Sequence, residues 1–122
     1  MKRLLGIVLL AVFMLTSHSA YAGFKSGNAL VNDMREFYKM GKNDQSINSI
    51  MAANYIGYII GVFDATESEY RSPEDITVGQ LCHIVAKFLE NNPERWSEPA
   101  DRLVRQALRK AFPKKLGGTG AK

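Results

Sequence analysis

The first twenty-two residues are the most informative feature of this chain, because they have the pattern of a cleavable export signal and leave only the rest of the chain to fold. Lys2 and Arg3 form a positive start, an apolar run follows from Leu4 to Leu15, and Ala20-Tyr21-Ala22 supplies small residues for cleavage after Ala22. This run is shorter than the roughly 20 residues of a membrane-spanning helix, and an uncleaved N-terminal anchor is the alternative interpretation. We therefore expect residues 1–22 to be a signal peptide and the rest of the chain to act outside the cytoplasm.

The remaining segment, residues 23–122, has the size of one small domain with a single core. Without Lys2 and Arg3 it carries 14 basic and 12 acidic residues, and this near-balance argues against a nucleic-acid binder. Cys82 is its one cysteine, so an intramolecular disulfide is excluded. The fold must therefore rest on packing alone, or on packing together with a partner subunit.

Apolar residues recur at helical spacing in four segments, and no strand-like alternation is found. The segments are residues 28–40, 46–66, 77–91 and 99–112. Thr77 and Gln80 have the spacing of a capping box, and Pro93 and Pro113 follow the last two helices. We predict an all-α fold, a compact bundle of four main helices within residues 23–113, followed by a disordered basic tail at 114–122.

The second of these segments is the most apolar, and small residues recur in it at every fourth position: Ala53, Gly57, Gly61 and Ala65. Two glycines inside a helix cost roughly 1 kcal/mol each relative to alanine. A close approach of another helix backbone would explain that cost. We therefore expect a central core helix with a second helix packed along this stripe.

Few side chains offer catalytic or metal chemistry. Cys82 and His83 are adjacent, so on a helix they point about 100° apart and do not form a catalytic pair. We predict a buried, inert thiol for Cys82, with an intermolecular disulfide as the alternative, and a solvent-facing His83. Acidic pairs such as Glu67 with Glu69 stand in a hydrophilic linker without an apolar cleft to raise a pKa. We expect no enzymatic activity, no metal site and no cofactor.

Charge is distributed unevenly along the chain. Residues 64–75 contain five acids and one base, whereas residues 102–122 contain seven bases and no acid. We expect the acidic linker to have fixed ends and a free tip, and Tyr and Arg are residue types enriched at binding hot spots. We predict a partner-binding site in this linker, with an ordinary connecting loop as the alternative. The residues of the predicted site are Asp64, Glu67, Glu69, Tyr70 and Arg71.

The basic residues Arg102, Arg105 and Arg109 are expected to form a solvated face, with binding of anionic lipid as the alternative.

Five short segments, in order and spacing, resemble the Rap/Tai family of immunity proteins associated with type VI secretion. The segments are Ser26-Gly27-Asn28-Ala29-Leu30; Gly57-Tyr58-Ile59-Ile60-Gly61-Val62-Phe63-Asp64-Ala65; Thr77-Val78-Gly79-Gln80-Leu81; Lys87-Phe88-Leu89 with Pro93; and Leu103-Val104 with Ala107-Leu108 and Phe112-Pro113. Many family members carry cysteines near these segments that this chain lacks.

The resemblance implies a small exported helical protein that neutralises a peptidoglycan amidase effector in the periplasm, often as a homodimer. Inhibition in that family is by occlusion of the amidase groove, and the acidic linker is our candidate for the contact on physical grounds. The alternative function is a periplasmic stress chaperone or an envelope-associated helical protein without a toxin partner. An acid-activated chaperone should bind an apolar dye at pH 2–3, so dye binding that stays low there would argue against this alternative.

Overall fold

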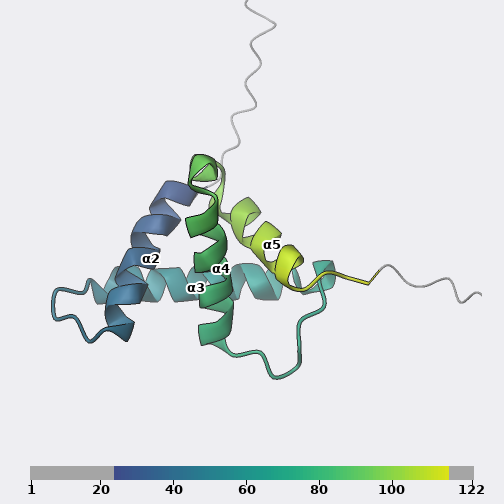
Figure 1. Ribbon diagram of the computed structural model, residues 1–122, viewed down its shortest axis with the longest axis horizontal. Helices are drawn as coiled ribbons and strands as arrows, with labels where there is room; N and C mark the ends of the chain where they lie inside the picture. Colours follow the sequence, from purple (N-terminus) through teal and green to yellow (C-terminus); the bar gives the residue numbers. More distant parts are fainter. Residues whose placement is uncertain (1–23, 116–122) are drawn as a thin grey trace, which may run out of the picture.

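The computed structural model describes residues 24–115, which form four α-helices and two short 3-10 helices (Figure 1). The α-helices are α2 (Gly27–Gly41), α3 (Ser49–Ala65), α4 (Val78–Asn91) and α5 (Ala100–Ala111). The 3-10 helices are η1 (Glu67–Glu69) after α3 and η2 (Pro93–Arg95) after α4. The prediction of an all-α bundle of four main helices is confirmed. The predicted signal peptide at 1–22 and residues 116–122 of the predicted tail lie outside the described residues.

Side-chain caps set the starts of three helices. The Ser26 hydroxyl accepts a hydrogen bond from the Ala29 N–H at 3.2 Å, and the Asn48 side chain accepts one from the Met51 N–H at the same distance. The predicted capping box at the start of α4 is present, because Thr77 and Gln80 bond each other's backbone N–H reciprocally. The starts of α2, α3 and α4 are therefore encoded locally in the sequence.

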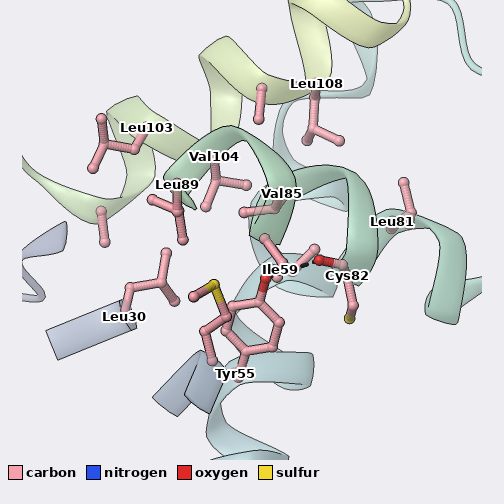
Figure 2. Close-up of a cluster of buried hydrophobic side chains, with 14 of the residues drawn as sticks. Leu30, Tyr55, Ile59, Leu81, Cys82, Val85, Leu89, Leu103, Val104 and Leu108 are labelled. Atoms are coloured by element: carbon pink, nitrogen blue, oxygen red, sulfur yellow. Dashed lines mark hydrogen bonds between the residues drawn. The ribbon is translucent and has the colours of Figure 1, made fainter. Parts of the chain in front are cut away.

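Helices α2, α4 and α5 lie across one side of α3, and each of them contacts it (Figure 1). The fully buried side chains come from all four helices and include Leu30, Tyr55, Ile59, Val85, Leu89, Leu103, Val104 and Leu108 (Figure 2). Tyr55 crosses this core, and its hydroxyl donates to the backbone oxygen of Cys82 at 2.8 Å (Figure 2). This bond satisfies a polar group that burial would otherwise penalise.

The small-residue stripe of α3 is exposed, so the expectation that another helix packs along it is wrong. A methyl group added to Gly57 or Gly61 would have no atom within 4 Å, and Ala53 and Ala65 are also exposed. The reason is that α2, α4 and α5 pack on the face of α3 where Tyr55 and Ile59 are buried, and this contact does not extend over the stripe. Among the described residues, no helix is long and apolar enough to cross a membrane.

A short backbone clamp joins the start of α2 to the start of α5. The Gly27 N–H donates to Glu98 O at 2.8 Å, the Asn28 N–H to Trp96 O at 2.7 Å, and the Ala100 N–H to Lys25 O at 2.9 Å. A methyl group on Gly27 would lie 2.6 Å from Trp96 O and 2.5 Å from Leu103 Cδ1. Glycine is therefore required there by the close approach of a second backbone.

Candidate partner-binding surface

The linker predicted to bind a partner runs from the end of α3 to the start of α4 (Figure 1). Its first residues are ordered by Thr66, whose hydroxyl donates to Val62 O at 2.7 Å at the end of α3. The 3-10 helix η1 follows at once and places Glu69 against α5. The linker therefore begins as a structured element and not as a free loop.

Two residues in the middle of the linker are fixed to the helical core. Tyr70 is only 4% exposed, its ring lies 5.4 Å from that of Phe63, and its hydroxyl donates to Phe63 O. The Arg71 N–H donates to Phe112 O at 3.1 Å, which joins the linker to the end of α5. The expectation that only the ends of the linker are fixed is wrong, because the apolar ring of Tyr70 is buried in the core.

Glu69 is held by two arginines of α5. Its carboxylate accepts hydrogen bonds from Arg105 Nη2 at 2.6 Å and Arg105 Nε at 3.1 Å, and from Arg109 Nε at 2.9 Å. These bonds, first of all those from Arg105, lower the pKa of the Glu69 carboxyl below its ordinary value. Glu69 thus remains ionised and connects η1 to α5.

The five predicted site residues therefore divide into two groups. Asp64, Glu67 and Arg71 have exposed side chains that can meet a partner. Tyr70 faces the core and Glu69 faces α5, so these two hold the segment in position. The segment 64–71 therefore presents charged side chains to solvent, while its Tyr70 and Glu69 side chains bind it to the rest of the domain.

The arginines of α5 form a face beside this segment, next to a hollow of about 450 Å³. The hollow is lined by Arg95, Glu98, Arg102, Arg105, Gln106 and Arg109. A second hollow of about 440 Å³ lies between α3 and α5, where Gly57, Gly61 and Ala65 leave space beside Asp101 and Arg105. Arg105 lines both hollows, so it links the arginine face to the exposed stripe of α3.

Cys82 and His83 lie elsewhere and point in different directions, as predicted. Cys82 is fully buried, and burial raises the pKa of its thiol to about 11, so the thiolate is disfavoured. His83 is exposed, with its ring 5.3 Å from that of Phe37. Among the described residues, no group of three or more His, Cys, Asp or Glu side chains is arranged to hold a metal ion.

The interaction of Glu69 with Arg105 and Arg109 was missed at the level of sequence. The partners stand 36 and 40 positions apart, so no local pattern connects them. One signal was present: two bases four residues apart on α5 and an acidic segment elsewhere in a small domain. The opposite charges indicate that an ion pair between the linker and α5 could form. Which of the five acids of residues 64–75 takes part is determined by the tertiary structure, and it is Glu69.

Comparison with known proteins identifies one family. Residues 26–113 match the family model described as Rap1a immunity proteins, a span that covers all four helices and the linker. No curated protein gives a significant match to the sequence.

Proposed function

The chain belongs to the Rap1a immunity protein family, and from this premise we propose that it binds and occludes a type VI secreted peptidoglycan amidase effector in the periplasm. An immunity protein acts on a toxin protein, so the family fixes the class of partner. The match over residues 26–113 carries the proposal, because it includes the complete helical domain. The export-signal pattern of residues 1–22 supports the periplasmic location, and the role is one of binding without catalysis.

We propose that the segment 64–71 makes the central contact with the amidase. A segment that is ordered before binding loses little conformational entropy in the complex, which favours affinity. Here Tyr70 and Glu69 supply that order, while Asp64, Glu67 and Arg71 remain available on the outside. The charges of these three side chains would then select a toxin surface of complementary charge.

A homodimer is also proposed, with the second copy on the exposed stripe of α3. Ile50 is 75% exposed on this helix, and the open space beside Gly57 and Gly61 would allow a second helix backbone to approach closely. Light scattering of the purified protein is expected to give twice the monomer mass, and Gly57→Arg is expected to restore the monomer. A monomeric wild-type protein would contradict this part of the proposal.

The test of the function is a binding and inhibition assay with a peptidoglycan amidase effector from the same genome, sought first among the genes beside this one. The purified protein should form a stable complex with that amidase and should stop its cleavage of peptidoglycan. The absence of both binding and inhibition would contradict the proposed function.

The test of the contact segment uses matched charge reversals. Asp64→Lys with Glu67→Lys should weaken amidase binding by about tenfold or more, as expected for the loss of roughly 1.4 kcal/mol or more at an interface centre. Glu90→Lys with Glu94→Lys changes the net charge equally at exposed sites outside the segment and should bind nearly as wild type. Equal affinities for the two variants would reject the segment while leaving the function intact.

A further inference from the structure

A third hollow, of about 230 Å³, lies between α4 and α5, which pack against each other (Figure 1). It shares no lining residue with the hollow on the arginine face. Its apolar lining comes from Ile84 and Phe88 of α4 and from Ala107 and Ala111 of α5. The two alanines leave the space open, because each side chain ends at a single methyl group.

Two lysines stand at this hollow, one on each helix. Lys87 of α4 and Lys110 of α5 line it, and both are exposed. Neither forms an ion pair or a hydrogen bond with another residue in the described part of the chain. The single acid of α5, Asp101, lines the hollow between α3 and α5 instead, and no acid follows it in the sequence. The hollow therefore combines apolar walls with two ammonium groups that have no acidic partner within residues 24–115.

The acids that neighbour this hollow in the sequence interact with other groups. Glu90 of α4 interacts with Tyr38 on α2. Glu98 is paired with Arg95, with 2.7 Å between Glu98 Oε1 and Arg95 Nε, and Glu94 interacts with the same arginine. The charge of Arg95 is thus balanced within η2 and the turn that follows it, and the positive charge at the hollow comes from the two lysines.

The hollow lies next to the end of α5 that holds the proposed contact segment 64–71. Ala111 lines the hollow, and the backbone oxygen of the next residue, Phe112, accepts the hydrogen bond from the Arg71 N–H at 3.1 Å. A protein–protein interface of standard size covers about 800 Å² on each partner. A toxin seated on the segment can therefore also cover the hollow.

We propose that the hollow receives an apolar side chain of the amidase effector that has a carboxylate beside it. This inference rests on the proposed function and adds a second contact next to the segment 64–71. The volume of the hollow is below the roughly 300–1,000 Å³ that is typical of small-molecule sites, so it suits one anchoring side chain better than a ligand. Anchors seated in pockets contribute much of the binding energy of protein interfaces, and a carboxylate would complement Lys87 and Lys110.

The two contacts carry charges of opposite sign, and this fixes the orientation of the toxin. Asp64 and Glu67 of the segment would meet basic groups, whereas Lys87 and Lys110 would meet acidic ones. A toxin docked the other way round would place like charges together, which costs binding energy. The hollow would therefore contribute to the choice of the cognate toxin as well as to affinity.

Two kinds of variant test the hollow separately from the segment. Ala111→Phe fills the hollow from an exposed position, and Ala111→Ser is its control because serine leaves the space open. Lys87→Glu with Lys110→Glu reverses the charge at the hollow. Lys42→Glu with Lys115→Glu makes the same change of net charge at exposed lysines that do not line it. Circular dichroism melting shows whether each variant is folded.

The experiment measures association and dissociation rates on the immobilised amidase. Ala111→Phe should weaken binding about tenfold or more, chiefly through faster dissociation, and Ala111→Ser should change it by about twofold or less. Lys87→Glu with Lys110→Glu should weaken binding about tenfold at about 0.05 M salt and by a smaller factor at about 0.5 M, because salt screens exposed charges. The control pair of lysines should change it by about threefold or less.

The outcomes separate this inference from the function on which it rests. If the wild-type protein bound no amidase effector, the proposed function and the docking of its toxin in the hollow would both be rejected. If the wild type bound an amidase and the Ala111→Phe and Lys87→Glu with Lys110→Glu variants bound it equally well, only the hollow would be rejected. A changed molar mass of Ala111→Phe in light scattering would assign the hollow to a contact between copies of the chain and overturn the proposal.

Discussion

Among the described glycines, Gly27 is the one at which an added side chain would collide with its neighbours. The backbones of residues 25–28 and 96–100 approach each other there through three hydrogen bonds of 2.7–2.9 Å. The glycine lets Trp96 O and Leu103 occupy the space in which a side chain would otherwise stand. Glycines elsewhere, such as Gly61 on the exposed side of α3, meet no such neighbour. The same residue type therefore has opposite consequences at two positions of one bundle.

Gly27→Ala is expected to lower the free energy of unfolding by about 1–3 kcal/mol, the usual cost of overpacking. The clash involves a backbone oxygen, which cannot move without breaking the clamp. Gly79→Ala is the matched control and should raise stability by about 0.4–1 kcal/mol, because alanine restricts the unfolded chain more and an added methyl group would lie 4.0 Å from its nearest neighbour. Urea unfolding followed by circular dichroism measures both changes. Equal stability of Gly27→Ala and wild type would contradict the account of the clamp.

At the scale of elements, the starts of α2, α3 and α4 are determined locally, whereas the course of the linker is not. Capping side chains stand immediately before α2, α3 and α4, and they bond N–H groups within three residues. The linker between α3 and α4 is shaped instead by contacts with distant residues, namely Arg105, Arg109 and Phe112. Local signals therefore predict helices well and predict the linker poorly.

The capping box of α4 makes a direct prediction. Thr77→Ala removes the side-chain acceptor for the Gln80 N–H and should cost about 1 kcal/mol of unfolding free energy. Thr77→Ser keeps the hydroxyl and should stay within a few tenths of a kcal/mol of wild type. Chemical unfolding curves for the three proteins provide the comparison. If serine and alanine were equally destabilising, the cap would not be the source of the effect.

At the scale of the whole molecule, two carboxylates link different elements, one through ion pairs and one through a backbone hydrogen bond. Glu69 joins η1 to α5, and the Asn48 N–H donates to Glu36, which joins the start of α3 to α2. The hydrogen bond from Asn48 is the main cause that lowers the pKa of Glu36, and the bonds from Arg105 lower that of Glu69. Both carboxylates stabilise the folded state only while they are ionised.

The pH dependence of stability follows from these directions. Folding lowers the pKa of both carboxyl groups, so each carboxylate adds to the stability of the folded state. This contribution is fully present above 4.5, the ordinary pKa of glutamate, and it is lost as the pH falls through the lower pKa of the folded state. The melting temperature should therefore be nearly level from pH 7 to about 5 and should fall below that. Glu69→Gln should melt lower at pH 7 and should lose less on acidification than wild type.

Melting curves between pH 3 and pH 7 test this expectation, with Glu67→Gln as the control at an exposed neighbouring position. The Glu67→Gln curve should follow that of the wild type throughout. Parallel curves for wild type and Glu69→Gln would show that the Glu69 bonds with Arg105 and Arg109 contribute nothing to acid sensitivity.

The sequence by itself determined the helices, their caps and the apolar faces of α2, α4 and α5, because helical periodicity and capping act within a few residues. It also indicated a buried Cys82 and an exposed His83 from their places on α4. Only the tertiary structure decided which side of α3 is covered, because that helix is apolar on several sides and its partners all pack on one. It likewise decided that Tyr70 is buried in the core and that Glu69 faces α5, since the contacts of Glu69 span 36 and 40 residues and depend on how the helices are packed.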